Sequence, residues 1–218
     1  MADILSGAIA CIGFSWIASP ACTELEMVTL DWLGNMLELP REFLFQSGGD
    51  GGGVIQGTAS EATLVAVLSA RARAVREHRE DENCVLSRLV CYGSRQAHSS
   101  VERAGMLAGV KMRLLEPDPE LSLTGQILAR AVEEDRAAGL LPFCCVATLG
   151  TTNTCAFDHL PSLGSVCRDQ VQGEGGGDVI YKHYHIYPGS LAPRRRGLRW
   201  QLLHLSRVPA SPQRCGAR

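Results

Sequence analysis

The sequence predicts an α/β domain built on a mostly parallel sheet with helices on its faces. Short apolar segments alternate with longer helical patterns along the first 168 residues. Each helical pattern is long enough to carry the chain back across a sheet, which favours parallel pairing of the strands. The chain has 218 residues, of which 45% are hydrophobic and 20% charged, so it can bury a substantial core.

Two capping patterns mark the first predicted helices. The segment Thr23–Glu26 has the spacing of a capping box, which predicts a helix that continues through Leu37. The segment Thr58–Glu61 repeats this spacing and predicts a long helix that runs to about Glu80.

Apolar runs and helical periodicity predict the remaining elements. The predicted strands are Val54–Gln56, Leu86–Tyr92, Val110–Leu115 and Pro142–Leu149. The predicted later helices are Ser99–Gly109, Thr124–Ala138 and His159–Arg168. In the last strand Cys144 and Cys145 are adjacent, so we expect their side chains to point to opposite faces of the sheet.

The segment 169–218 differs from the rest of the chain. Residues 1–170 carry 13 basic and 21 acidic side chains, a net charge of −8, whereas residues 171–218 carry 8 basic and 2 acidic side chains, a net charge of +6. This segment is rich in Gly, Pro and Arg and has no sustained helical or strand period. We therefore expect two parts, a folded domain over 1–168 and an unrelated, basic and disordered tail over 169–218.

Composition excludes several classes of protein. The net charge of −2 favours neither nucleic acid nor a membrane surface as a partner. Nine cysteines without a C-x-x-C spacing favour buried free thiols over a disulfide framework or a metal site, and they fit a cytoplasmic location. The uncharged segment 4–23 follows Asp3 and no basic residue, which is not typical of a signal peptide.

Three segments could bind a ligand, because each follows a predicted strand. Thr58, Ala59 and Ser60 begin the long helix, and backbone N–H groups at a helix start favour a phosphate. His98 follows a strand and precedes a helix, where an imidazole can stack on a flat ring or move a proton. The run from Thr148 to Thr152 combines small and hydroxyl residues at the end of the most apolar strand. Each segment taken alone also fits an ordinary helix cap or strand-end turn.

Several longer motifs carry a family resemblance. They occupy residues 12–16, 19–26, 51–53, 55–63, 96–105 and 147–152. In these motifs and their order, the chain resembles the group II pyridoxal-phosphate-dependent amino-acid decarboxylases over about residues 1–168. Gly57, Ala59, Ala62 and the run 139–143 resemble the aromatic-L-amino-acid branch of that family more than the histidine decarboxylase branch.

The resemblance implies a partial fold-type I large domain, pyridoxal 5′-phosphate as cofactor, an aromatic L-amino acid as substrate and a homodimer. It places cofactor-phosphate binding on Thr58, Ala59 and Ser60, and cofactor stacking with a catalytic role on His98. It also places Thr152 near the cofactor. Ile12 and Phe14 match positions that line the substrate's aromatic pocket across the dimer interface.

Two family motifs are missing from these residues. The family's His-x-Asp-Ala-Ala motif supplies an aspartate for the pyridine nitrogen, and its Asn-Pro-His-Lys motif supplies the lysine that holds the cofactor covalently. The lysines here are Lys111 and Lys182, and neither has the surrounding motif. We therefore expect a fragment of the large domain that has no turnover by itself. The alternatives are a non-catalytic fragment that binds the cofactor weakly or pairs with a full-length subunit, and a histidine decarboxylase.

Overall fold

A computed structural model describes residues 1–170, except 11, 14, 38, 49–50 and 79–80, together with the strand 180–183. The described residues divide into two compact units, the first from Met1 to Ile55 and the second from Gln56 onward. The candidate ligand-binding segments at Thr58, His98 and Thr148 all belong to the second unit.

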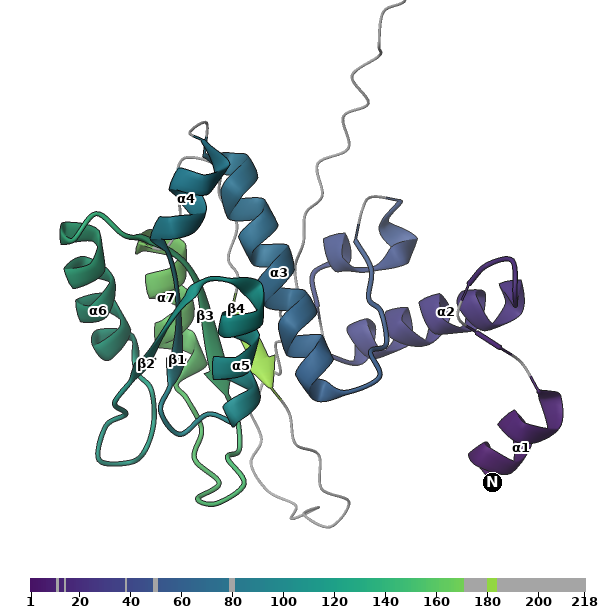
Figure 1. Ribbon diagram of the computed structural model, residues 1–218. Coiled ribbons are helices and arrows are strands. Elements are labelled where there is room, and N and C mark those ends of the chain that lie inside the picture. The colour runs from purple at the N-terminus through teal and green to yellow at the C-terminus, as the bar shows by residue number, and fades with distance from the viewer. Residues whose placement is uncertain are drawn as a thin grey trace, which may run out of the picture. The chain divides into compact units, whose positions relative to one another are not determined.

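Helices and strands alternate in the second unit. Its helices are α3 (Ala59–Glu77), α4 (Glu82–Arg88), α5 (Ser99–Ala108), α6 (Gly125–Ala137) and α7 (Leu160–Gln170). Its strands are β1 (Leu89–Ser94), β2 (Lys111–Leu115), β3 (Leu141–Thr148) and β4 (Ile180–His183). The four strands form one sheet in the order β2-β1-β3-β4, and every neighbouring pair is parallel (Figure 1). The predicted α/β class with a parallel sheet is confirmed.

Each face of the sheet is covered by its own pair of helices. Helices α3 and α5 pack on one face, and α6 and α7 pack on the other (Figure 1). Strands β1 and β3 are buried almost throughout, because both of their faces are covered. As expected, Cys144 belongs to the core under α3 and α5, whereas Cys145 belongs to the core under α6 and α7.

The chain reverses its direction of winding between β1 and β3. From β1 it passes through α5 to β2 on one side, and from β3 it passes through α7 to β4 on the other side. The two connections also use opposite faces of the sheet. In open α/β sheets, ligands bind outside the carboxyl ends of the strands at the point where the strand order reverses in this way.

Helices α3 and α5 both begin at this carboxyl edge. Helix α5 starts directly after β1 and leads back to the start of β2, so it runs from the carboxyl edge to the amino edge. Late in α3, the Arg71 side chain donates a hydrogen bond to the carbonyl of Ala108 at the end of α5. The later part of α3 therefore lies beside the end of α5, which places the start of α3 toward the carboxyl edge.

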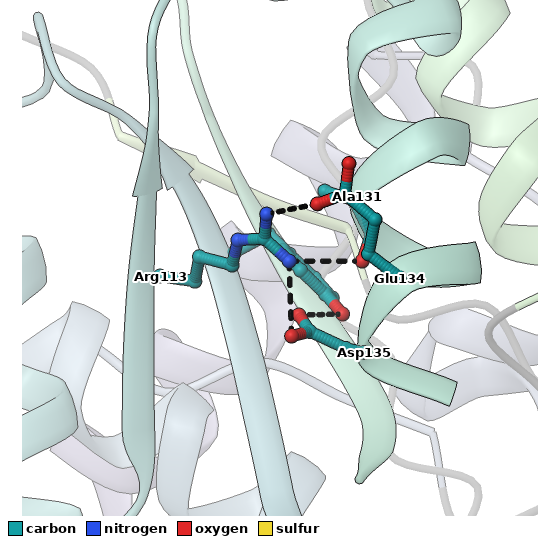
Figure 2. A network of polar contacts seen from close by, with 5 residues as sticks. Arg113, Ala131, Glu134 and Asp135 are labelled. Atoms are coloured by element: carbon teal, nitrogen blue, oxygen red, sulfur yellow. Dashed lines mark hydrogen bonds and ion pairs between the residues drawn. The ribbon is translucent and has the colours of Figure 1, made fainter. Parts of the chain in front are cut away.

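A buried polar network fastens α6 to the sheet. Figure 2 shows Arg113 of β2 extended toward Ala131, Glu134 and Asp135 of α6. Its Nη1 atom lies 2.9 Å from Asp135 Oδ1, and the Tyr92 hydroxyl of β1 donates to Asp135 Oδ2 over 2.8 Å. Burial and the hydrogen bond to Asp135 raise the pKa of Tyr92 far above its ordinary value. Ion pairing with Glu134 and Asp135 raises the pKa of Arg113, so the cation is held firmly.

The first unit contains α1 (Ala2–Ile9), α2 (Pro20–Met36) and the short 3-10 helices η1 (Arg41–Phe43) and η2 (Phe45–Ser47). The buried carboxylate of Asp31 accepts hydrogen bonds from the backbone N–H groups of Phe45 and Gln46. A Cβ atom at Gly34 would lie 2.6 Å from Leu44 Cδ2, so a larger residue there would displace the buried Leu44 side chain. No helix in the part of the chain that the structure describes has the length and apolar character of a membrane span.

Three predicted element boundaries were wrong. Helix α2 begins at Pro20 after Ser19, because proline at the first helical position needs no hydrogen-bond acceptor; Thr23 donates to Ser19 inside the helix. The segment 54–56 is not a strand. The expected strand from Leu86 begins only at Leu89, because Asp81 caps α4 through the N–H groups of Asn83 and Cys84.

The predicted tail meets the described structure at two places. Helix α7 continues to Gln170, and Ile180–His183 pair in parallel with the end of β3. The expectation of no regular structure was therefore wrong for these four residues. Residues 171–179 and 184–218 lie outside the described residues, and the boundary at 168 stays a prediction.

Candidate cofactor site

The start of α3 has the properties of an anion site. The Thr58 hydroxyl caps the helix by accepting a hydrogen bond from the N–H of Glu61 over 3.1 Å. Helix geometry leaves the N–H groups of Ala59 and Ser60 without an acceptor inside the helix. These two donors and the positive end of the helix dipole therefore face the same place, and an anion there would be stabilised.

His98 caps the start of α5. Its Nδ1 atom accepts a hydrogen bond from the backbone N–H of Ser100 over 3.1 Å and lies 2.9 Å from the Ser100 hydroxyl. Because Nδ1 accepts from the amide, the neutral ring carries its hydrogen on Nε2. The cap fixes the plane of an exposed imidazole at the carboxyl edge of the sheet, so capping and ligand binding are compatible roles for this residue.

The turn after β3 is held by its own hydroxyl groups. Gly150 adopts φ of +83°, a conformation that favours glycine. The Thr151 hydroxyl lies 2.6 Å from the Thr154 hydroxyl and accepts from the N–H of Ala156. Thr152, the residue singled out from the sequence, is exposed at the top of this turn.

Asp158 joins this turn to the loop before α6. One carboxylate oxygen accepts from the N–H of Thr148 over 2.7 Å, and the other accepts from the N–H of Leu123 over 2.8 Å. Burial raises the pKa of Asp158, and the two backbone hydrogen bonds oppose that rise. The sequence reasoning missed this residue, because its two partners lie 10 and 35 positions away in the chain.

Thr148 carries a buried hydroxyl without a partner. Among the described residues, its Oγ1 is a buried side-chain atom that makes no hydrogen bond. Sequence reasoning named Thr148 only as the first residue of the strand-end run. The alternation of side chains along β3 is the signal that could have identified it, because Cys144, Val146 and Thr148 share one face.

The structure places the predicted site residues in two groups. The first group lies in the second unit, on segments at the carboxyl edge of the sheet, and consists of Thr58, Ala59, Ser60, His98 and Thr152.

The other predicted positions lie apart from this edge or outside the described residues. Ile12 belongs to the first unit and is 64% exposed, and Phe14 lies outside the described residues. Lys111 is the first residue of β2 and so lies at the amino edge of the sheet, opposite the carboxyl edge. Lys182 is in β4, in register with Ala147.

Comparison with known families decides the relationship. The pyridoxal-dependent decarboxylase conserved domain matches residues 1–182.

The chain belongs to the pyridoxal-dependent decarboxylase family.

Its relatives include enzymes that act on aromatic amino acids. The chain is 63% identical over 171 residues to the aromatic-L-amino-acid decarboxylase of Drosophila lebanonensis, a match that covers 76% of this chain and 42% of that protein. The chain therefore spans less than half of the length of this curated relative. The family resemblance seen in the sequence motifs is confirmed, and the matched domain continues past residue 168.

Solved structures agree in fold. Catharanthus roseus tryptophan decarboxylase in complex with L-tryptophan superposes with a TM-score of 0.71 at 38% identity, over 83% of this chain and 37% of that chain. Oryza sativa TDC with PLP and tryptamine gives a TM-score of 0.72 at 36% identity, over 83% of this chain and 36% of that chain. The prediction of a partial fold-type I decarboxylase domain is confirmed.

The described residues fit the family's cofactor. A phosphate needs several N–H or O–H donors, and the start of α3 offers the N–H groups of Ala59 and Ser60. The hydroxyl of Thr148, buried and unpartnered at the same edge, indicates that a polar group absent from the protein belongs there.

Proposed function

We propose that the chain forms part of a pyridoxal-phosphate-dependent decarboxylase that converts an aromatic L-amino acid to its amine with loss of carbon dioxide. The observation that carries this proposal is the reversal of the strand order between β1 and β3, with α3 and α5 both beginning toward the carboxyl edge of the sheet. The aromatic-L-amino-acid decarboxylases among the relatives support the substrate class.

The residues at the carboxyl edge of the sheet have separate roles in binding the cofactor. The N–H groups of Ala59 and Ser60, together with the hydroxyl groups of Thr58 and Ser60, bind the phosphate. The imidazole of His98, fixed by Ser100, lies against the cofactor ring and orients it. Thr152 lies at the exposed end of the turn and contributes its hydroxyl.

Pyridoxal phosphate supplies an electron sink for the electron pair that remains when the carboxyl group leaves. The protein contributes orientation, exclusion of water and placement of protons. Since His98 Nδ1 accepts from the helix start, Nε2 is the ring atom suited to hold a proton near the reacting groups.

The substrate pocket and the assembly are part of the same proposal. Ile12 and Phe14 provide apolar surface for the aromatic ring of the substrate in a homodimer, and the exposure of Ile12 leaves it available to a second subunit. We place the protein in the cytoplasm, in agreement with its free cysteines.

Catalysis by these 218 residues alone would need one of the two lysines to hold the cofactor covalently. Lys111 lies at the amino edge of the sheet, and Lys182 lies in β4 without the family's lysine motif. We propose that neither residue holds the cofactor covalently, so the chain by itself binds pyridoxal phosphate reversibly and releases no carbon dioxide.

Binding of pyridoxal phosphate to the 218-residue protein tests the site. Equilibrium dialysis should show saturable binding that weakens at least fivefold in Ser60→Ala and in His98→Ala. Two matched variants should bind as the unchanged protein does. Ser165→Ala removes an exposed helical hydroxyl, and His159→Ala removes another exposed histidine beside a helix start, but both lie on the α6 and α7 side. Equal losses in the matched variants would contradict the assignment.

Borohydride reduction and product analysis test the role of the lysines. Peptide mapping after reduction should find no cofactor on Lys111 or Lys182, and neither dopa, 5-hydroxytryptophan nor histidine should yield carbon dioxide. Cofactor fixed to either lysine together with amine formation would contradict the proposal. Amine formation from histidine alone would move the substrate to the histidine branch.

A further inference from the structure

We propose that Thr148 is an additional cofactor-binding residue, whose hydroxyl donates a hydrogen bond to an oxygen atom of pyridoxal phosphate. This inference rests on the function proposed above and extends it. Neither the family motifs nor the helix N-termini assign a role to the Thr148 side chain. Three observations carry it: burial, the missing partner and the direction of the side chain.

Thr148 is only 5% exposed, and its Oγ1 makes no hydrogen bond with the described residues. Its backbone is fully engaged with Asp158, because its N–H donates to the carboxylate over 2.7 Å and its carbonyl accepts from the Asp158 N–H over 2.9 Å. A buried hydroxyl left without a partner costs about 1–3 kcal/mol, so a bound group that accepts from it is strongly favoured.

The other buried hydroxyl groups around this edge are satisfied within the protein. Thr63 donates to the carbonyl of Ala59, Thr151 lies 2.6 Å from the Thr154 hydroxyl, and Ser94 accepts from the N–H of Gln96. Thr148 is the exception among these groups. Its missing partner is therefore a local feature and does not reflect loosely packed polar groups throughout the region.

The side chain of Thr148 points to the face on which the phosphate-binding helix begins. Side chains alternate along a strand, and Cys144 and Val146 both pack under α3 and α5. Thr148, two residues further on, continues on that face and is the last residue of β3. It thus reaches the carboxyl edge on the face of the sheet that α3 and α5 cover, and both of these helices begin toward that edge.

Two substitutions of Thr148 test the inference in the full 218-residue protein. Thr148→Val keeps the shape and removes the hydroxyl, whereas Thr148→Ser keeps the hydroxyl. The measurements are the dissociation constant for pyridoxal phosphate from equilibrium dialysis and the melting temperature with and without the cofactor. Since one hydrogen bond is lost, Thr148→Val should bind about tenfold more weakly, and Thr148→Ser should bind within about twofold of the unchanged protein.

The substitution Thr148→Val should have different effects on the melting temperature without cofactor and on the gain in melting temperature that the cofactor gives. Without cofactor, Thr148→Val should melt at the same or a higher temperature, because an unpaired buried hydroxyl is replaced by a methyl group. With cofactor, the same variant should gain less stability than the unchanged protein. If the hydroxyl had only a structural role, Thr148→Val would lower the melting temperature without cofactor. The increase in melting temperature on cofactor binding would then be unchanged.

The outcomes separate the two proposals. If the unchanged protein and Thr148→Ser bind pyridoxal phosphate and Thr148→Val binds it equally well, the role of Thr148 is overturned and the proposed function stands. If the unchanged protein shows no saturable binding, both proposals are overturned. The inference is supported if Thr148→Val binds pyridoxal phosphate more weakly and its melting temperature without cofactor is not lowered.

Discussion

Asp158 is the residue that most directly determines the shape of the carboxyl edge. Its carboxylate spans the end of β3 and the loop before α6 by accepting from the N–H groups of Thr148 and Leu123. In Asp158→Asn one acceptor oxygen becomes an NH₂ group that faces an N–H donor. We expect a loss of about 1–3 kcal/mol in the free energy of unfolding, measured by urea denaturation. Asp169→Asn, at an exposed position of α7, should be close to neutral.

The same pair of proteins tests the raised pKa of Asp158. A carboxyl group with a higher pKa in the folded state holds its proton more tightly there, so its contribution to stability falls as pH rises from its ordinary value near 3.8 to the raised value. Asp158→Asn has no such titration. The stability advantage of the unchanged protein should therefore be largest at acid pH and narrow as pH rises through this window. An advantage that widened with pH would show that the folded-state pKa is not raised.

Glu61 places a negative charge at the helix start that we assign to phosphate. A side chain at Gly57 would lie 2.7 Å from Glu61 Oε2, so this carboxylate reaches back over the first turn of α3. Glu61→Gln should tighten binding of pyridoxal phosphate by about two- to fivefold, because an exposed pair of like charges costs up to about 1 kcal/mol. Equilibrium dialysis at low and high salt measures the dissociation constants of both proteins for pyridoxal phosphate. An unchanged affinity at low salt would place the phosphate elsewhere.

The site residues that could be predicted are those whose role depends on short-range sequence. Thr58 and Glu61 form a cap within four positions, and His98 caps α5 through Ser100 two positions later. Asp158 and Thr148 could not be identified in this way. Their significance comes from partners brought together, or left absent, only when β3 enters the sheet.

At the scale of elements, the network of Tyr92, Arg113 and Asp135 holds three segments together. Asp135 is buried and contacts both other residues, whereas Glu134 is more than half exposed. Asp135→Ala should cost about 2–3 kcal/mol, since it leaves the buried Tyr92 hydroxyl without its acceptor and removes one of the acceptors of Arg113. Glu134→Gln should cost at most about 1 kcal/mol. Equal losses in urea denaturation would show that Asp135 is not the centre of the network.

Element boundaries could be predicted where the cap is local and apolar periodicity is strong. The bounds of α3, α5 and α6 agree with the sequence within about three residues. The segment Leu86–Arg88 was mistaken for strand because Leu86 lies just before the apolar residues of β1, whereas the cap at Asp81 begins a helix that includes this segment. Pro142 is the second residue of β3 although it has no N–H, and the pairing of β1 with β3 shifts register beside it.

At the scale of the whole molecule, the first unit exposes many large apolar side chains. Ile17 is 97% exposed and Ile4 is 71% exposed, and further exposed residues on this unit include Ile9, Trp16, Leu25, Trp32 and Met36. Surfaces of this kind mark sites of association between proteins. They are consistent with the homodimer that we propose.

Light scattering with size-exclusion chromatography tests this association. Replacing Ile4 and Ile17 together with serine should weaken self-association of the 218-residue protein at least tenfold, because two large apolar side chains no longer leave water. Met106→Ser, at an exposed position of α5, serves as the matched control and should leave association unchanged. A stronger effect of Met106→Ser would place the contact on the second unit.

The reactivity of four buried cysteines can report on the opening of the structure around the sheet. These residues are Cys91, Cys144, Cys145 and Cys167. The pKa of the Cys144 thiol is raised by its hydrogen bond with Cys91 and by burial, and that of Cys145 by its hydrogen bond with Cys167 and by burial. A protonated, covered thiol does not attack an aromatic disulfide reagent, whereas the exposed Cys84 and Cys155 are accessible to it. The buried thiols should therefore react slowly, at a rate set by the opening of the helix layers that cover β3. Bound pyridoxal phosphate should lower this rate.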